Sequence, residues 1–275
     1  MPRPTTNASI VLVGSGNMGS AMLDGWLAHG VPAASICVVE PAAANAAAAE
    51  SRGVAVIDTP ALLDTGSAPD VLVLAVKPQA MDSLLAAYAK VAAHGAVVLS
   101  IAAGKTIESL TQKLGASTAV VRAMPNTPAS IRLGISVACA NAHASKVQRA
   151  RCDELLACVG NVLWVEDERL LDAVTAVSGS GPAYVFLLAE CLAVAGREAG
   201  LPAALAERLA RETVVGAGAL LARSSLPFET LRGNVTSPGG TTAAALSILM
   251  ADDGLQPLLS RAVSAATERA RELAC

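Results

Sequence analysis

The chain has 275 residues, of which 53% are hydrophobic and only 2% aromatic, and its mean hydropathy is +0.51. The net charge is −3 and no basic block occurs, which argues against a nucleic-acid or anionic-membrane partner. The longest uncharged stretch, residues 173–189, is broken by Ser-Gly-Ser-Gly-Pro, so we expect no membrane span. Residues 1–9 do not resemble a signal peptide, and we therefore expect a cytoplasmic protein. Six scattered cysteines and three isolated histidines predict neither a disulfide framework nor a metal site.

Short apolar runs alternate with helical patterns in the first half of the chain. Each run is continuously apolar, as strands buried on both faces of a parallel sheet are. A doubly wound α/β sheet is therefore predicted for this half. The expected strands are residues 10–13, 36–39, 54–57, 71–75, 97–100 and 120–122, and the expected helices are residues 17–29, 42–52, 79–91 and 107–114.

The second half is mostly helical. One short strand, residues 162–165, is expected to close the sheet, and we place the domain boundary after Glu166. Residues 1–166 then form the sheet domain and residues 167–275 a helical domain. The expected helices are residues 145–159, 170–177, 183–199, 202–222, 242–250 and 255–273.

A glycine-rich motif follows the first predicted strand and opens the first predicted helix. It reads Gly14-Ser15-Gly16-Asn17-Met18-Gly19, a G-x-G-x-x-G pattern in the context that dinucleotide binding requires. The first glycine allows a tight turn, the second allows close approach of a pyrophosphate, and the third lets the helix pack against the strand. The alternative is a glycine-rich turn without a ligand, but the strand–helix context favours a dinucleotide.

An acidic residue, Glu40, ends the second predicted strand. A carboxylate at this place normally accepts hydrogen bonds from the ribose hydroxyls of NAD and repels the 2′-phosphate of NADP. The next ten positions contain no Arg or Lys, and Arg52 is the nearest basic residue. This pattern favours NADH, or use of both coenzymes, unless Glu40 is simply a solvated loop residue.

Two further loops end strands at the same predicted edge of the sheet. Ala75-Val76-Lys77-Pro78 follows the fourth strand, where Lys77 is either a steering cation for the coenzyme or an ordinary surface lysine. Met124-Pro125-Asn126-Thr127-Pro128 follows the sixth strand. Its two prolines make a rigid polar loop that suits a nicotinamide ring, although a surface turn explains it equally well.

The helical half contains two loops of small and hydroxyl residues, each directly before a helix. Such a loop offers backbone N–H groups to a carboxylate, and the helix dipole favours the negative charge. Ordinary helix capping by Ser and Thr is the alternative. The loops are Ser178-Gly179-Ser180-Gly181-Pro182-Ala183-Tyr184 and Thr236-Ser237-Pro238-Gly239-Gly240-Thr241-Thr242.

Taken together, these stretches resemble the Δ1-pyrroline-5-carboxylate reductase family over essentially the whole chain. The matching segments are residues 14–19, 75–78, 122–128, 171–184 and 234–242. The resemblance implies NAD(P)H-dependent reduction of the cyclic imine 1-pyrroline-5-carboxylate to L-proline, the last step of proline biosynthesis. It also implies a Rossmann-type first domain and an all-α second domain that interlocks with a second subunit, with dimers often assembled into decamers.

The resemblance further implies roles for individual residues. Coenzyme contacts are expected at the glycine motif and at Ala75, Val76, Lys77, Pro78, Ala103, Met124, Pro125, Asn126 and Asn234. The substrate carboxylate is expected at Ser178, Gly179, Ser180 and Gly181 of one subunit and at Gly240, Thr241 and Thr242 of the other, with Glu168 as a substrate-side acid. Thr242 matches the threonine whose hydroxyl reaches the ring nitrogen, and we expect it to orient the imine rather than to supply a proton. Many family members have Asn, Thr or Ser and a basic residue near position 40, whereas this chain has Glu40-Pro41-Ala42. This chain therefore departs from the family pattern at the residues that set coenzyme preference.

Three alternatives remain at this stage. A 3-hydroxyacid dehydrogenase of the same architecture would normally carry a catalytic lysine in the helical half, where this chain has no lysine after Lys146. A non-catalytic nucleotide-binding protein would have no reason to keep both helix-start loops intact. A purely structural role for the Ala-rich helices leaves the glycine motif unexplained.

Overall fold

The computed structural model describes residues 8–63 and 69–273. It divides the chain into two compact units, Met1–Gly179 with Ala266–Cys275 and Ser180–Ala265, which we describe separately. The first seven residues, where we expect no signal peptide, and Cys275 lie outside the described residues. The expected domain boundary after Glu166 remains a prediction.

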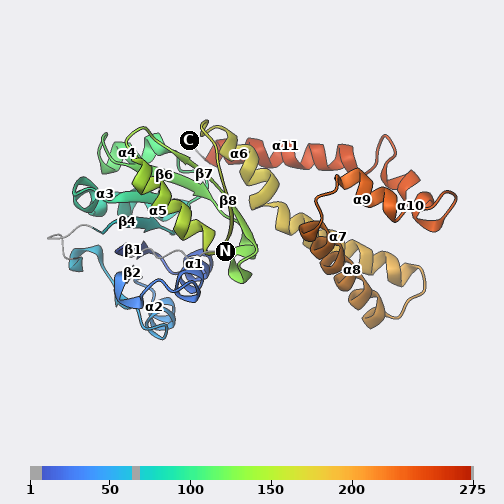
Figure 1. Cartoon of the computed structure of the whole chain (residues 1–275), viewed down its shortest axis with the longest axis horizontal. Helices are drawn as coiled ribbons and strands as arrows, with labels where there is room; N and C mark the ends of the chain where they lie inside the picture. The colour runs from blue at the N-terminus through green and yellow to red at the C-terminus, as the bar shows by residue number, and fades with distance from the viewer. Residues whose placement is uncertain (1–7, 64–68, 274–275) are drawn as a thin grey trace. The chain divides into compact units, whose positions relative to one another are not determined.

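Unit 1 is built on one sheet, which in the described residues has eight strands in the order β3-β2-β1-β4-β5-β6-β7-β8. Neighbouring strands are parallel except for β6 and β7, which are antiparallel. The doubly wound α/β fold expected from the alternating pattern is confirmed (Figure 1). The strands are β1 (Ile10–Val13), β2 (Ile36–Val39), β3 (Ala55–Ile57), β4 (Val71–Leu74), β5 (Val97–Ser100), β6 (Val120–Met124), β7 (Gly134–Ala140) and β8 (Gly160–Trp164).

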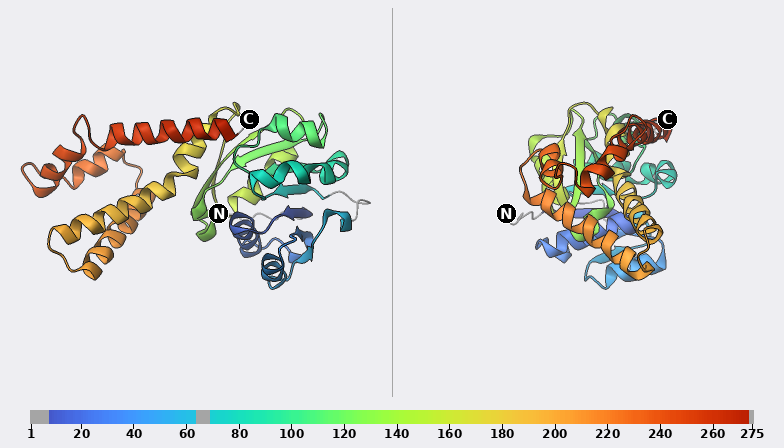
Figure 2. Two further views of the ribbon diagram at one scale, coloured as in Figure 1. Left: turned by 180° about the vertical axis from the view of Figure 1, so that it is seen from behind. Right: turned by 90° about the vertical axis from the view of Figure 1, so that its right-hand side faces the viewer.

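Helices cover both faces of this sheet, as Figures 1 and 2 allow the reader to follow. On one face lie α1 (Asn17–Ala28), α2 (Ala43–Glu50) and α5 (Lys146–Ala157), and on the other lie α3 (Pro78–Ala93) and α4 (Ile107–Leu114). Both layers bury apolar side chains against alternate residues of the strands, so the strands are apolar throughout. The short helices η1 (Ala33–Ser35), η2 (Pro60–Leu62) and η3 (Thr127–Ile131) lie in the connections.

Strand β7 is an element that the apolar pattern does not predict. Its sequence, Gly-Ile-Ser-Val-Ala-Cys-Ala, consists mostly of small residues that are weak strand formers. Gly134 is required at its start, because a Cβ there would lie 2.9 Å from the carbonyl oxygen of Val159. The strand inserts between β6 and the expected closing strand, so β8 is the edge strand and begins at Gly160.

The expected loop at residues 178–184 is wrong. Helix α6 (Leu170–Val174) continues through a π-helical turn, η4 (Thr175–Gly179), into α7 (Gly181–Glu198). The hydroxyls of Thr175 and Ser178 donate to the carbonyl oxygens of Leu171 and Val174, at 2.7 and 3.0 Å, and hold the turn in a helical path. Pro182 does not break α7, because it lies in the first turn of that helix, where a missing N–H is tolerated.

This helical stretch, 170–198, is also long and apolar enough for a membrane span when judged by length and composition alone. An 18-residue window has a mean hydropathy of 1.4, and 6% of the window is buried. Our expectation that no window would qualify is therefore wrong on composition. The Ser-Gly-Ser-Gly-Pro segment does not end the helical path, because it joins the π-helical turn to the first turn of α7, and it carries no charge.

Unit 2 is helical. Helices α7 and α8 (Ala203–Arg223) form a hairpin, in which small buried residues, Ala193, Ala206 and Ala210, let the two helices approach closely (Figure 1). They are followed by α9 (Phe228–Asn234), which was not predicted, by α10 (Thr241–Leu249) and by the first part of α11 (Leu255–Leu273). Many large apolar side chains of this unit are exposed, among them Phe186, Leu209, Val215, Phe228 and Ile248. An apolar surface of this extent is typical of a protein–protein interface.

Candidate active site

The glycine motif forms the turn between β1 and α1. Gly14 has φ +88°, and a Cβ there would lie 3.0 Å from the carbonyl oxygen of Ala75. A Cβ at Gly19 would overlap the carbonyl oxygen of Gly14. Gly16 is exposed and has space around it, so the backbone at this position is open to a ligand. These three environments fit the roles that dinucleotide binding gives to the three glycines.

Backbone hydrogen bonds connect the carboxyl ends of the central strands. Gly14 N donates to Val39 O at 2.9 Å, and Ala75 N donates to Val13 O at 2.8 Å. The loops after β1, β2 and β4 are thereby held side by side. This is the sheet edge at which open α/β folds bind their ligands.

Glu40 is a fixed part of this edge rather than a solvated loop residue. Its side chain is buried, and Oε2 accepts hydrogen bonds from the N and Oγ of Ser15 at 2.8 and 3.3 Å. Its Oε1 accepts from Ala42 N at 2.9 Å. The carboxylate is therefore positioned against the glycine loop before any coenzyme binds.

Arg52, the nearest basic residue after Glu40, is already paired. Its Nε and Nη2 donate to the two carboxylate oxygens of Asp24 at 2.6 and 3.0 Å, and Nη1 donates to Ala48 O. A bidentate pair of this kind occupies the guanidinium group. The hydrogen bond to Asp24 is the main reason that the pKa of Arg52 is raised.

A groove of about 570 Å³ runs along α1 from the glycine loop. It has the size and position for part of a dinucleotide. Its lining residues are Ser15, Gly16, Asn17, Met18, Ser20, Ala21, Asp24, Asn45, Thr127 and Ser130.

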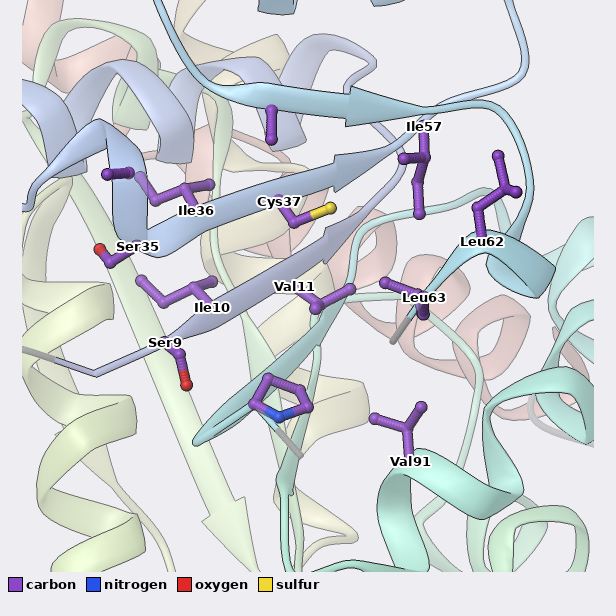
Figure 3. Close-up of a pocket in the computed structure, with 13 residues that line it drawn as sticks. Ser9, Ile10, Val11, Ser35, Ile36, Cys37, Ile57, Leu62, Leu63 and Val91 are labelled. Carbon is purple, nitrogen blue, oxygen red and sulfur yellow. The ribbon is translucent and has the colours of Figure 1, made fainter. Parts of the chain in front are cut away.

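A second hollow, of about 320 Å³, lies at the opposite edge of the sheet (Figure 3). It is lined by Ser9 and Ile10 at the start of β1 and by Ile36 and Cys37 at the start of β2. Burial raises the pKa of the Cys37 thiol, which makes it a weaker nucleophile. The hollow therefore has neither the position nor the chemistry of the coenzyme site.

The loop after β4 and the loop after β5 complete the coenzyme edge. Lys77 is exposed and precedes α3, whose first residue is Pro78. Ala103 lies in a turn with Gly104, which has φ +75°. A Cβ at Gly104 would lie 2.8 Å from the carbonyl oxygen of Leu273, so the end of α11 packs on this turn.

The side chain of Asn126 connects two segments that were expected to bind different ligands. Its Nδ2 donates to the carbonyl oxygen of Ser178 at 3.1 Å, and its Oδ1 accepts from Ile135 N at 2.9 Å. Met124 lies beside the same turn, because a Cβ at Gly179 would come within 2.6 Å of its Cε. The predicted coenzyme loop and the start of the predicted substrate segment are therefore in contact within unit 1.

Glu168 is predicted to lie on the substrate side. In the structure its Oε1 is hydrogen-bonded to residues of unit 1. That oxygen accepts from Arg122 Nη1 and from Ile107 N, both at 2.8 Å. Asp172 lies 4.0 Å from the buried Arg122 guanidinium as well.

Arg122 is a buried charged residue of this region for which the sequence pattern predicted no role. It stands in an apolar strand, where a charge must be paired. A buried arginine needs an acidic partner, and Glu168 and Asp172 follow β8 in the sequence. These two facts together could have predicted the ion pair. A partner 46 positions away is not visible in local pattern.

The remaining predicted site residues lie in unit 2. Asn234 ends α9, and Gly240, Thr241 and Thr242 form the start of α10. The N-cap of α10 is Gly240, which has no side chain to satisfy the first N–H groups of the helix. Ser180, the N-cap of α7, makes no side-chain capping hydrogen bond, but α7 follows directly on the π-helical turn η4. The start of α10 is therefore the helix start with the chemistry to receive a carboxylate.

The five described cysteines are unpaired. Cys139, Cys152 and Cys158 are buried, and burial raises the pKa of each thiol, to about 12 for Cys152 and about 11 for Cys158. Thiols in such surroundings pack as small apolar groups and are poor nucleophiles.

Comparison with known proteins gives consistent matches along the chain. A family model described as pyrroline-5-carboxylate reductase dimerisation matches residues 168–273, and one described as NADP oxidoreductase coenzyme F420-dependent matches residues 9–104. The pyrroline-5-carboxylate reductase of Pseudomonas aeruginosa is 42% identical over 96% of each chain. That of Glycine max is 34% identical over 99% of this chain and 98% of its own.

Solved structures agree with these matches. A pyrroline-5-carboxylate reductase from Coxiella burnetii superposes with a TM-score of 0.92 at 34% identity, covering 98% of this chain and 100% of that one. The Plasmodium falciparum pyrroline carboxylate reductase, solved with NADP bound, gives a TM-score of 0.84 at 28% identity, covering 98% and 99%.

Proposed function

The chain belongs to the pyrroline-5-carboxylate reductase family, and from this we propose that it reduces 1-pyrroline-5-carboxylate to L-proline with NADH or NADPH. The match of 42% identity over 96% of the chain carries the proposal. The glycine edge of unit 1 supports it, because its backbone already has the shape that a dinucleotide requires. The boundary between a coenzyme domain and a helical domain is placed after Glu166, close to residue 168, where the dimerisation model begins.

The coenzyme residues are assigned along that edge. The glycine loop receives the pyrophosphate, and Glu40 accepts from a ribose hydroxyl through the carboxylate that Ser15 and Ala42 hold in place. The bound coenzyme supplies a hydride. The further contacts assigned to it are Gly14, Ser15, Gly16, Asn17, Met18, Gly19, Ala75, Val76, Lys77, Pro78, Ala103, Met124, Pro125, Asn126 and Asn234.

The substrate residues are assigned to the two helix starts. The carboxylate of the imine lies on the backbone N–H groups of Ser178–Gly181 from one subunit and of Gly240–Thr242 from the other. The Thr242 hydroxyl bonds the ring nitrogen and orients the imine carbon toward the hydride. Because the imine nitrogen is protonated before transfer, a C–H bond forms as the C=N bond becomes single, and no strong acid is needed on the protein. Glu168 supports this site from the side of Arg122, with Oε2 as its substrate-facing oxygen.

The coenzyme preference is proposed to lean toward NADH. A 2′-phosphate placed at the ribose would meet the charge of Glu40, and the nearest basic side chain, Arg52, is bound by Asp24. Repulsion by Glu40, with the guanidinium of Arg52 already bound to Asp24, disfavours NADPH.

The assembly is proposed to be a dimer formed by the helical unit, with dimers joining into a decamer in the cytoplasm. The exposed apolar side chains of unit 2 support this, because a second copy would cover them. The apolar stretch 170–198 has the same explanation: we propose that it is buried between subunits and not in a lipid bilayer. We propose no nucleic-acid partner and no membrane association.

One assay tests the reaction. Purified protein is mixed with 1-pyrroline-5-carboxylate and either NADH or NADPH, and loss of absorbance of the reduced coenzyme is followed together with proline formation. We expect turnover with both coenzymes and a higher kcat/KM with NADH. Absence of proline with either coenzyme would contradict the proposed reaction, and a higher kcat/KM with NADPH would contradict the proposed preference alone.

A further inference from the structure

We propose that Asn126 is a positioning residue whose side chain replaces a hydrogen bond that Pro182 removes, and so fixes the Ser178 turn for the substrate carboxylate. The inference rests on the proposed function, since that function places the carboxylate at this turn. It assigns Asn126 a task other than the coenzyme contact implied by family resemblance.

The need for a partner follows from the sequence of the turn. In a regular α-helix the carbonyl of residue 178 accepts from the N–H of residue 182. Residue 182 is a proline and has no N–H, so the Ser178 carbonyl loses its regular donor. Ser178 is half-buried, and a carbonyl that is partly shielded from water is stabilised when another group supplies a donor.

Asn126 supplies that donor. Its Nδ2 lies 3.1 Å from Ser178 O, although 52 positions separate the two residues. Its Oδ1 accepts from Ile135 N at 2.9 Å, so both ends of the amide are engaged, and the side chain is only 9% exposed. These bonds also fix the amide orientation, because only nitrogen can donate to a carbonyl.

The packing around this bond transmits the position of β6 to the turn. Met124, two residues earlier, lies so close to Gly179 that a Cβ there would approach its Cε to 2.6 Å. Arg122, two residues earlier again, is bonded to Glu168 at the base of α6. Arg122 and Met124 of β6 and Asn126 in the loop that follows it thus contact α6 and the π-helical turn, and Asn126 contacts the end nearest to the proposed carboxylate site.

The Asn126→Asp variant tests the donor. Aspartate keeps the oxygen that accepts from Ile135 N. Its second oxygen replaces the amide nitrogen and cannot donate to Ser178 O, so the hydrogen bond between residue 126 and the turn is lost. We expect the KM for 1-pyrroline-5-carboxylate to rise on the order of tenfold to a hundredfold, because small displacements of a binding group are costly. The Kd for the reduced coenzyme, measured by fluorescence, separates this effect from the coenzyme contact that is also assigned to Asn126. Adding Pro182→Ala to Asn126→Asp should lower the KM for the imine again and leave the coenzyme Kd where Asn126→Asp puts it.

A matched control is available at the other end of β6. Asn141 Oδ1 accepts from Val120 N at 3.1 Å, and its Nδ2 donates to Thr118 O at 2.8 Å. Asn141→Asp therefore removes the same kind of amide-to-carbonyl bond close to β6 but away from the π-helical turn. It should leave the KM for the imine unchanged.

A second variant restores the missing donor by another route. Pro182→Ala returns an N–H to position 182, so Asn126→Asp/Pro182→Ala should recover part of the loss in KM. Amide hydrogen exchange of residues 175–183 gives a readout that does not depend on turnover. Exchange there should accelerate in Asn126→Asp and slow again in the double variant.

The outcomes separate this inference from the proposed function. A wild-type protein without imine reduction refutes the function, while faster exchange in Asn126→Asp still supports the positioning role. Unchanged exchange at residues 175–183, or an equal rise in KM in Asn141→Asp, would overturn it. If Asn126→Asp does not fold, Asn126→Ser, which adds no charge, serves for the same comparison.

Discussion

The carboxylate of Glu40 shows how one residue can shape a site before its ligand arrives. It is buried against the glycine loop and accepts hydrogen bonds from two backbone N–H groups, those of Ser15 and Ala42. The sequence predicted its place at the end of β2 but not these bonds, because they depend on how the loop folds back. The two hydrogen bonds hold the carboxylate in one position. Its negative charge can therefore discriminate between coenzymes through its location as well as its sign.

Replacing that charge should shift coenzyme preference. Glu40→Gln keeps an oxygen that can accept from Ser15 N but removes the negative charge. We expect the ratio of kcat/KM for NADPH to that for NADH to rise by a factor on the order of ten, since one like-charge repulsion is removed. Steady-state kinetics with both coenzymes measures the ratio, and an unchanged ratio would show that Glu40 does not discriminate.

Thr242 carries the second prediction at this scale. Thr242→Ala should lower turnover by a factor on the order of ten to a hundred, because one hydrogen bond that orients the imine is lost. Thr236→Ala is the matched control, since its hydroxyl lies in the loop before α10 and donates to Arg232 O of the preceding helix α9. Equal effects of the two substitutions on kcat would argue against a role in orientation.

At the scale of elements, the strands and long helices followed from sequence, whereas β7, α9 and the π-helical turn did not. Buried strands such as β4 are continuous runs of Val and Leu, and any local pattern reveals them. Strand β7 is built from small residues and owes its place to pairing with β6 and β8. The contacts of Arg122 and Asn126 span 46 and 52 positions, so they belong to tertiary structure.

Helix α5 and the residue that caps its C-terminus place two thiols, Cys152 and Cys158, in the core, and this makes stability sensitive to alkaline pH. In the folded chain the pKa is about 12 for Cys152 and about 11 for Cys158, against an ordinary value of 9.0. Below pH 9 both thiols are protonated in the folded and unfolded states. Between about pH 9 and 11 the unfolded thiols ionise while the folded ones stay protonated, so stability falls as pH rises.

The expected slope is about 1.4 kcal/mol per pH unit for each thiol. Urea unfolding at several values between about pH 8 and 10.5 measures it. Cys152→Ala should reduce the slope, and Cys191→Ala, at a thiol exposed in the chain, should not. A slope that Cys152→Ala leaves unchanged would contradict the assignment to this helix.

At the scale of the whole molecule, high apolarity with few aromatic residues is explained by a helical unit that another copy covers. The helical unit exposes large aliphatic and aromatic side chains on several helices, while unit 1 buries its own core. By composition alone, either a lipid bilayer or a second subunit could cover this apolar surface. The family match to a dimerisation domain over residues 168–273 favours the second subunit.

A charge placed on this surface should weaken assembly. Phe186 is 67% exposed on α7, and Phe186→Glu should lower the mass measured by light scattering toward that of one chain. Val147, 63% exposed on α5 of unit 1, provides the control. Val147→Glu should leave the mass unchanged, and a wild-type protein that is a well-behaved monomer would refute the explanation.

The parallel run of β1 to β6 has a practical consequence. Every loop assigned to the coenzyme in unit 1 follows the carboxyl end of a strand, so the turns that precede the strands lie at the far edge. One of them, residues 115–117, is exposed and begins with a glycine at φ +117°. An affinity tag, a fluorophore or a surface tether inserted there would leave the glycine loop untouched. The protein can thus be immobilised in one orientation, with its coenzyme edge turned toward the solution.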